Sequence, residues 1–439
     1  MTDLLAARLQ MAISLGFHIL FAVAGIAMPV LMVIAERRWQ QTGDPLALDL
    51  AKRWARGTAI LFAVGAVSGT VLSFELGLLW PHFMSFSGAL IGLPFSLEGF
   101  AFFTEAIFLG VYLYGWERVS RRAHLAAGVL VAVSGTASGI FVVIANAWMN
   151  APTGFRMEAG RPVDIDPIAA MLNPAAFPQT LHMTLAAYAA TGFVVAGIHA
   201  WRLLRDPGNP FHRRALRIAM LVAAPAAILQ PLSGDVSARH VAKHQPAKLA
   251  AIEALFQTRT GAALTLGGWP DEETGTVRWG IEVPYALSLL AYHDPNAEVT
   301  GLEDISRDEW PPVGIVHLAF QIMVGLGLYM AAVGLWAAWR WWRHRDLASS
   351  PRLLRAIVIG APMGLIAIEA GWTVTEVGRQ PWIVYGVLRT SEAVTPMPFL
   401  VGPLVLITLL YLFLGAVVAF LLYREVMASP TRGAAGGSE

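Results

Sequence analysis

The chain has 439 residues, of which 56% are hydrophobic and only 14% are charged, whereas a soluble domain carries roughly a quarter charged residues. This composition excludes an ordinary soluble domain and indicates a polytopic membrane protein. The sequence contains no cysteine, which excludes disulfides, thiolate metal sites, iron–sulfur clusters and covalently attached c-type haem. The net charge of +1 gives no reason to expect a nucleic-acid partner, and we expect none.

Nine apolar stretches are each long enough to cross a hydrocarbon core about 30 Å thick. In chain order they occupy about 11–34, 55–80, 94–115, 124–149, 179–201, 215–233, 312–339, 353–376 and 398–423. We therefore expect an all-α polytopic membrane protein with nine transmembrane helices. Helices 1–6 lie in 1–233, an outer loop in 234–311, helices 7–9 in 312–423 and a tail in 424–439.

The sequence of the long loop at 234–311 predicts local secondary structure. The segment LAAIEALF favours a short amphipathic helix, and Gly267-Gly268 favours a turn. No other polar insertion is as long, so this loop is the main candidate for a binding element outside the membrane.

Basic residues are shared unevenly between the other loops. They gather after the first, third, fifth and seventh stretches and in the tail, for example at Arg37, Arg121, Arg213, Arg343 and Arg432, whereas the loop at 81–93 contains none. Loops rich in Lys and Arg stay on the cytoplasmic side of a membrane. The pattern predicts a periplasmic N-terminus, a cytoplasmic C-terminus and an outer position for the loop at 234–311.

Polar side chains interrupt the apolar stretches, where a charge is costly and usually marks a functional site. The candidates, together with one methionine, are His18, Glu75, Glu98, Glu105, His182, His317, Met323, Glu369 and Glu376. The glutamates at 98 and 105, and those at 369 and 376, are seven residues apart, so each pair shares one helix face. Four histidines near the arginine-rich ends are expected to be solvated: His124, His199, His212 and His344.

Two interpretations of these residues fit the chemistry. Imidazole and carboxylate groups can be axial ligands of haem iron, since thiolate is excluded. Alternatively, the acids can form a proton relay, as in transporters and pumps. The two are compatible, because a haem that reduces oxygen needs protons. The residues alone indicate a redox or transport protein and leave this choice open.

Several motifs resemble subunit I of cytochrome bd-type quinol oxidases. They are ARLQMAISLGFHILF at 7–21, SLEGFAFFTEAIFLG at 96–110, GDVSARHVAKHQPAKLAAIEA at 234–254, FQIMVGLG at 320–327, EAGW at 369–372 and GRQPW at 378–382. The matches recur in register along nearly the whole chain. The loop lacks a long second half, which is typical of the short quinol-loop type, and RQPWIVYGVLRTSEAV is similar to the cyanide-insensitive branch.

The resemblance implies three haems. His182 and Met323 match the axial ligands of a low-spin haem b, while His18 and Glu369 match the single protein ligands of two high-spin haems. One high-spin haem is haem b, and the third haem is haem d or haem b. Trp372 falls within the matching EAGW segment as a cofactor-binding residue, and Arg379 matches a residue that pairs with haem propionates.

The resemblance also implies the reaction. Lys248 and Glu253 match loop residues that take part in quinol oxidation at the outer face, with Glu253 as a base. Glu98 and Glu105 match acids near the oxygen-reducing haem and its proton path, and Glu98 can itself approach the iron. Ubiquinol or menaquinol would be oxidised outside and O2 reduced to water with cytoplasmic protons. This charge separation generates a membrane potential without pumping.

Members of this family work in assemblies in the bacterial cytoplasmic (inner) membrane. The resemblance therefore implies a second membrane subunit, subunit II, and allows a small single-helix subunit beside it.

Two positions depart from the pattern of many members. Gln321 stands where many carry arginine, which should lower the reduction potential of the nearby low-spin haem. Leu365 stands where many carry a tryptophan, four residues before the ligand glutamate.

Two other functions remain as alternatives. A haem-free, proton-coupled transporter would use Glu75, Glu98 and Glu105 as its relay, but it predicts inverted repeats that the sequence does not show. A haem-b quinol dehydrogenase that does not react with O2 would need only His182 and Met323, and would leave His18 and Glu369 unexplained.

Overall fold

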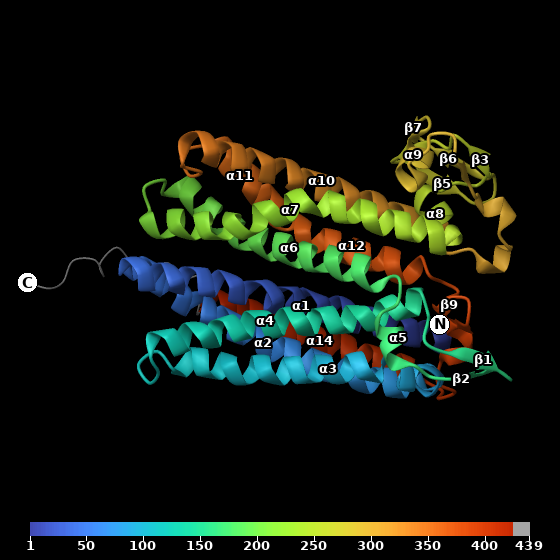
Figure 1. Cartoon of the computed structure of the whole chain (residues 1–439), viewed down its shortest axis with the longest axis horizontal. Helices are drawn as coiled ribbons and strands as arrows, with labels where there is room; N and C mark the ends of the chain where they lie inside the picture. The colour runs from blue at the N-terminus through green and yellow to red at the C-terminus, as the bar shows by residue number, and fades with distance from the viewer. Residues whose placement is uncertain (425–439) are drawn as a thin grey trace, which may run out of the picture. The chain divides into compact units, whose positions relative to one another are not determined.

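The computed structural model of the chain describes residues 1–424; residues 425–439, with Arg432 and nearly all of the expected tail, lie outside the described residues. Within the described part, nine helical segments are long and apolar enough to span a membrane (Figure 1). They are α1 (Asp3–Thr42), α2 (Pro45–Leu79), α3 (Pro81–Tyr114), α4 (Arg121–Asn150), α6 (Ala176–Arg205), α7 (Pro210–His244), α10 (Val313–His344), α11 (Pro351–Gly360) with α12 (Met363–Val377), and α14 (Val401–Leu422). The nine predicted stretches are confirmed.

Local signals in the sequence set the ends of these helices. Proline is the first residue of α2, α3, α7 and α11, a position where its missing N–H is not needed. Helix α1 begins after Thr2, whose hydroxyl caps the first turn, and ends at Gly43 with a φ of 71°. The eighth predicted stretch is not one continuous helix, because α11 and α12 are separated at Pro362, which cannot donate to the helical hydrogen-bond ladder.

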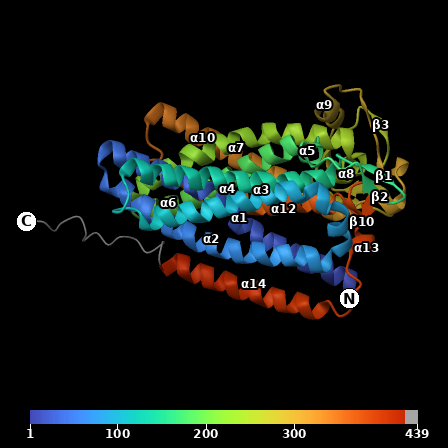
Figure 2. The same ribbon diagram turned by 60° about the horizontal axis from the view of Figure 1, so that its bottom comes forward.

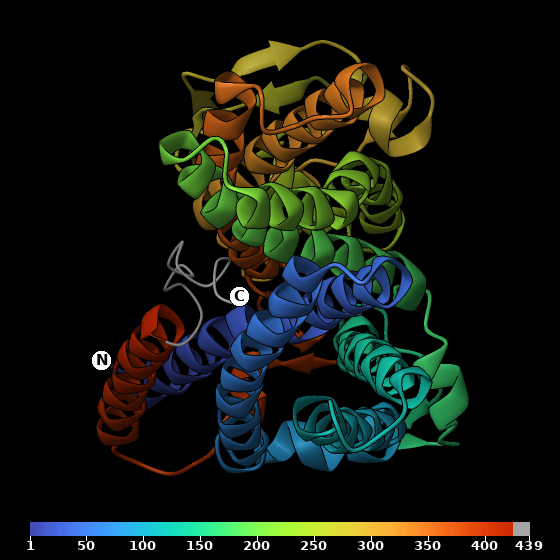
Figure 3. The same ribbon diagram turned by 90° about the vertical axis from the view of Figure 1, so that its left-hand side faces the viewer.

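The chain divides into two compact units. Unit 1 comprises 1–74, 104–133 and the chain from 397, and unit 2 comprises 75–103 and 134–396. In unit 1, α14 runs beside α1 (Figure 3), and the rings of Phe17 and Tyr411 stack with their centroids 4.5 Å apart. Unit 1 therefore keeps the first and last of the nine spans together.

A buried contact between a histidine and a glutamate in unit 1 corrects one expectation. His124 was expected to be solvated, but it is only 2% exposed, and its Nδ1 lies 2.9 Å from Oε1 of the buried Glu36. In unit 2 the expectation also fails for His199 and His212, which are buried with their Nδ1 atoms 2.9 Å apart. These residues lie near helix ends, but their rings turn into the contact with the neighbouring helix. His344 is exposed, as expected.

Helices α6, α7, α10 and α12 pack against one another in unit 2, and α11 packs on α6 (Figures 1 and 3). Small residues bring the helices close together. A Cβ added at Gly192 of α6 would lie 2.7 Å from Cβ of Ala223 in α7, and one added at Gly364 of α12 would lie 2.5 Å from Cα of Ala190 in α6. Such close approach is how membrane helices associate without a hydrophobic driving force.

The outer loop is shorter than predicted, because α7 continues through 234–244 and ends at His244. It then forms α8 (Pro246–Glu253), which confirms the predicted short helix. The strand pairs that follow are β3 (Arg259–Thr260) with β8 (Glu298–Val299), β4 (Leu264–Leu266) with β7 (Ile281–Val283), and β5 (Trp269–Asp271) with β6 (Thr276–Arg278). Gly267 and Gly268, with φ of 65° and 89°, form the predicted turn between β4 and β5.

The same loop also contains α9 (Ala286–Tyr292) and two 3-10 turns, Leu302–Asp304 and Arg307–Glu309. Figures 1 and 2 place the loop at the same end of α7 and α10 in both views. The remaining short elements of unit 2 are β1 (Arg156–Glu158) paired with β2 (Arg161–Val163), α5 (Pro167–Met171), β9 (Trp382–Val384) paired with β10 (Leu388–Arg389), and α13 (Thr390–Ala393).

Candidate functional site

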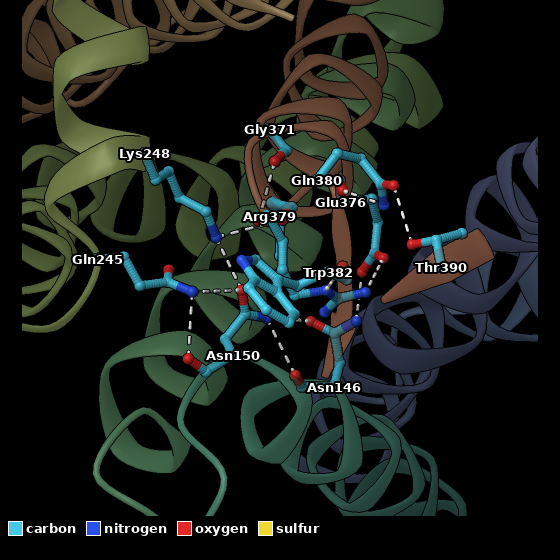
Figure 4. Close-up of polar contacts among 11 residues, drawn as sticks. Asn146, Asn150, Gln245, Lys248, Gly371, Glu376, Arg379, Gln380, Trp382 and Thr390 are labelled. Atoms are coloured by element: carbon cyan, nitrogen blue, oxygen red, sulfur yellow. Dashed lines mark hydrogen bonds and ion pairs between the residues drawn. The ribbon is translucent and has the colours of Figure 1, made fainter. Parts of the chain in front are cut away.

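A buried polar cluster joins the outer loop to α4 and α12 (Figure 4). Lys248 of α8 is only 3% exposed, and its Nζ donates to Oδ1 of Asn150 at 2.7 Å and to the carbonyl of Thr375 at 3.2 Å. Gln245 donates to the backbone carbonyl of the same asparagine at 3.1 Å. Burial, together with the nearby positive charge of Arg379, lowers the pKa of Lys248 to about 7, and Glu376 opposes the change. Lys248 is thus held in one place and titrates near neutral pH.

The cluster continues from Asn150 to the arginine of GRQPW. Asn150 donates from Nδ2 to the carbonyl of Asn146 at 3.0 Å, and Asn146 donates to one oxygen of Glu376. The other oxygen of Glu376 accepts from Nη2 of Arg379 at 2.5 Å. Arg379 is buried, and its Nη1 has no hydrogen-bond partner among residues 1–424. This free donor fits a carboxylate such as a haem propionate.

Glu253 lies at the end of α8, one residue after the buried Ile252. It is only 3% exposed, and one carboxyl oxygen, Oε2, has no hydrogen-bond partner within the described chain. Burial raises the pKa of Glu253 to about 8, although a hydrogen bond from the Thr265 backbone opposes the change. Sequence reasoning treated this residue as a loop acid in contact with water, whereas the structure buries it. A base whose pKa lies near the working pH is well suited to accept a proton.

His182 of α6 is oriented by a serine of α7. The hydroxyl of Ser233 donates to the carbonyl of Gln230 at 2.9 Å, so it accepts from Nδ1–H of His182, 3.0 Å away. This arrangement leaves Nε2 with its lone pair, as metal-binding histidines require. In this structure, however, Nε2 of Gln230 lies 3.1 Å from that atom. The side chain of Gln230 must therefore turn away for His182 to bind a metal.

Met323 of α10 lies against a glycine of α12. A Cβ added at Gly371 would be 2.8 Å from Sδ of Met323, closer than real Cβ contacts occur. The thioether therefore occupies space that a side chain at 371 would take. Because α6, α7, α10 and α12 pack together, the donor set of an imidazole and a thioether on these helices fits a low-spin haem.

His18 of α1 repeats the arrangement seen at His182. Ser68 of α2 donates to the carbonyl of Val64 at 2.9 Å and accepts from Nδ1–H of His18 at 2.9 Å. A Cβ at Gly69 would lie 3.1 Å from Cε1 of the ring. The glycine lets the imidazole approach α2, and Nε2 stays available for a metal. These residues all belong to unit 1.

The two glutamates of α12 have different surroundings. Glu369 lines an open groove of about 650 Å³ between α10 and α12, together with Thr373 and the exposed Ile315, Leu318, Ile322 and Ile366. Its buried Oε1 has no hydrogen-bond partner in the part of the chain that is described. Both carboxyl oxygens of Glu376 are instead bonded, as shown in Figure 4. An open apolar groove with an unpartnered carboxylate oxygen can accept the edge of a haem.

The acids of α3 are divided between the units. Glu105, in unit 1, is buried; Oε1 has no partner in residues 1–424 and would lie 3.9 Å from a Cβ at Gly25 of α1. Glu98, in unit 2, is half-buried, as is Trp372 of α12. The structure thus brings Lys248 together with Arg379, while His18 and Glu105 belong to a different unit.

Sequence reasoning missed four residues of the site: Asn146, Asn150, Ser68 and Ser233. The asparagines had a signal, because they stand four residues apart at the end of an apolar stretch, where an amide needs a buried partner. The serines had none, because serine is common in membrane helices and usually bonds to its own backbone.

Comparison with known proteins agrees with these features. The family described as cytochrome bd terminal oxidase subunit I matches residues 6–430. Two Bacillus subtilis proteins are similar to the chain. A putative cytochrome bd menaquinol oxidase subunit I is 36% identical over 96% of both chains, and a cytochrome bd ubiquinol oxidase subunit 1 is 33% identical over 97% of this chain and 94% of that protein.

A further relative and a solved structure give the same result. The cytochrome bd-II ubiquinol oxidase subunit 1 of Escherichia coli is 27% identical over 88% of both chains. The structure of the bd oxidase from Geobacillus thermodenitrificans has a TM-score of 0.91, with 39% identity over 98% of this chain and 99% of that one. Because the family model matches residues 6–430 and the relatives cover almost the whole chain, the chain belongs to the family of cytochrome bd terminal oxidase subunit I.

Proposed function

We propose that the chain is the haem-bearing subunit of a terminal quinol oxidase, which oxidises a membrane quinol and reduces O2 to water. The observation that carries the proposal is the buried connection from Lys248 in the outer loop, through two asparagines, to Glu376 and Arg379. It links the segment that resembles a quinol loop to the segment that would hold a haem. A haem-free transporter has no use for this connection, and a haem-b quinol dehydrogenase that does not react with O2 would leave His18 and Glu369 unexplained.

We assign three haem positions in this proposal. His182 and Met323 would hold the low-spin haem b. His18 would hold one high-spin haem and a glutamate of α12 the other. One of these two high-spin haems is haem b, and the other is haem d or haem b. Bound haem supplies one-electron transfer and, where an axial position is open, a place for O2. Ser68 and Ser233 orient the two imidazoles, and Arg379 offers its free guanidinium nitrogen to a propionate.

Two glutamates of α12 are candidates for the carboxylate ligand. Glu369 is supported by its unpartnered oxygen and by the open apolar groove that it lines. Glu376 is supported by Trp372, which stands four residues before it. Many family members have a tryptophan at this distance before the ligand glutamate, whereas Leu365 stands four residues before Glu369. Glu376 is also adjacent to Arg379, whereas Glu369 is ten residues, about 15 Å of helix, from it. Substitution distinguishes them: glutamine at the ligand position removes one high-spin haem signal, and glutamine at the other position leaves all haems in place.

Quinol oxidation is assigned to the loop. Glu253, whose pKa is raised to about 8 by burial, accepts a quinol proton and releases it toward the outer water. Lys248, fixed by Asn150, orients a quinol oxygen. Glu98 and Glu105 would pass cytoplasmic protons to the oxygen-reducing side. Proton release on one face and uptake on the other generate the membrane potential without pumping. This requires the predicted topology, with a periplasmic N-terminus and a cytoplasmic C-terminus.

The same proposal extends to the assembly. The chain would lie in the bacterial cytoplasmic membrane with subunit II, and with a small single-helix subunit where one is present. The quinol is ubiquinol or menaquinol; the two Bacillus relatives are named for different quinols.

The first test is a dithionite-reduced minus oxidised spectrum of the purified complex, with pyridine haemochrome extraction and quinol-dependent O2 uptake. A red chlorin band beside b-type bands identifies haem d, and three b-type haems without it identify the haem-b-only branch. A colourless complex without O2 uptake refutes the proposal and favours the transporter that uses Glu75, Glu98 and Glu105. Haem with quinol oxidation but no O2 uptake supports the quinol dehydrogenase.

A further inference from the structure

His317, which the sequence left without a role, is wholly enclosed beneath the outer loop. It lies in the first turns of α10 and is 0% exposed. Its Nδ1 is 2.7 Å from the carbonyl oxygen of Ile252, and its Nε2 is 3.0 Å from the carbonyl oxygen of Gly267. Both partners are carbonyl oxygens, which accept from a ring nitrogen that carries a proton.

Gln321 stands four residues later, on the same face of α10, and binds the same loop. Its Oε1 accepts from the backbone N–H of Gly267 at 3.0 Å, and its Nε2 donates to the carbonyl of Thr265 at 2.9 Å. An amide can accept and donate at once. Arginine, common at this position in the family, has donors only. The departure from the family pattern therefore gives this chain a bond that arginine cannot make.

The two side chains converge on one turn. Gly267 is held through its carbonyl by His317 and through its N–H by Gln321, and its φ of 65° favours glycine. The contacts also reach the base of the quinol site. Ile252 immediately precedes Glu253, and the Thr265 backbone bonds to the Glu253 carboxyl group. All four hydrogen bonds go to loop backbone atoms on either side of this acid.

We propose that His317 and Gln321 are positioning residues for quinol oxidation: together they fix α8 and β4 on α10 and so hold Glu253 in place. The inference rests on the proposed quinol oxidase function. The two residues do not touch quinol in this scheme; they act through the loop backbone. We call His317 and Gln321 together the clamp. Because Met323 lies two residues beyond Gln321, the clamp also fixes the loop relative to the helix that supplies a ligand of the low-spin haem.

The test uses the complete oxidase complex with His317→Phe, Gln321→Ala and Gln321→Arg, and Leu328→Ala on an exposed part of α10 as the matched control. Each variant is checked for haem content by its difference spectrum, which shows whether it has folded. Steady-state kinetics with a soluble quinol give KM and kcat, and limited trypsin digestion at exposed Arg278 in β6 reports on loop docking.

Loss of two hydrogen bonds should lower kcat/KM about tenfold, mainly through KM, with faster cleavage at Arg278 and unchanged haem content. Gln321→Arg keeps only the bond to Thr265 and should lie between Gln321→Ala and the parent. Leu328→Ala should behave like the parent. Because His317 and Gln321 act on the same glycine, the double variant should lose less than the product of the single losses.

Two results overturn the proposal: unchanged cleavage in both His317→Phe and Gln321→Ala, or faster cleavage with unchanged kcat/KM, which would make the clamp purely structural. Failure of the proposed function is distinguishable, because the parent complex would then show no quinol oxidation at all. Without quinol oxidation the two residues have no role in positioning Glu253 for it. Trypsin digestion at Arg278 would still show whether they hold the loop on α10.

Discussion

Replacing Asn150 by aspartate tests how the buried lysine is tuned. Asn150 presents a neutral oxygen 2.7 Å from Nζ of Lys248. Aspartate would put a negative charge there. Coulomb's law with an effective dielectric constant of about 20 gives about 6 kcal/mol for unit charges at this distance. Desolvation of the new carboxylate offsets much of this, so we expect the pKa of Lys248 to rise by about 1–3 from its value near 7.

The assay is the pH dependence of kcat/KM for quinol oxidation. The limb governed by Lys248 should be centred near pH 7 in the parent and should move to higher pH in Asn150→Asp, whichever protonation state of the lysine is active. Gln245→Ala is the matched control, because it removes a neighbouring bond to the Asn150 backbone without adding a charge. A limb that stays in place in a folded, haem-replete Asn150→Asp complex would refute the assigned role of Lys248.

The remaining predictions concern three other positions. Glu253→Gln should abolish the rise of kcat/KM as pH passes through about 8, because the ionised carboxyl group is the active base; a persistent rise would assign the base elsewhere. Gln321→Arg should raise the reduction potential of the low-spin haem, measured by redox titration, since it restores a positive charge; an unchanged potential would contradict this. His124→Ala should lower the free energy of unfolding by about 1–3 kcal/mol, because the buried Glu36 loses one hydrogen-bond partner and keeps Gln40; thermal unfolding in detergent measures it, and an unchanged stability would contradict a buried contact.

Hydropathy was sufficient for the fold because each span is a local property of about twenty consecutive residues. It located all nine apolar helices, but not the break at Pro362 or the extension of α7 to His244. The break depends on a single proline, which membrane helices often tolerate. The extension depends on tertiary contacts, since 234–244 is too polar to be recognised as part of a span.

The candidate site was only partly predictable, because its hydrogen bonds join residues far apart in sequence. Lys248 could be singled out from its motif, but its partner Asn150 is 98 residues away. For the same reason His124 could not be distinguished from a solvated histidine, since Glu36 is 88 residues away. Motif matching identifies which residues have special chemistry, and only the packed helices show what stabilises or neutralises each of them.

The close glycine contacts of α6 affect how much the distances between α6 and its neighbouring helices can vary. Where Gly192 and Gly364 meet Ala223 and Ala190, backbone lies almost directly on backbone. A helix–helix contact of this kind contains no long side chain whose change of rotamer could increase the distance between the helices. The distance from α6, which carries His182, to α7 and α12 should therefore vary little with temperature or bilayer thickness. Electron transfer depends steeply on distance, so these small residues would make its rate insensitive to the surrounding lipid.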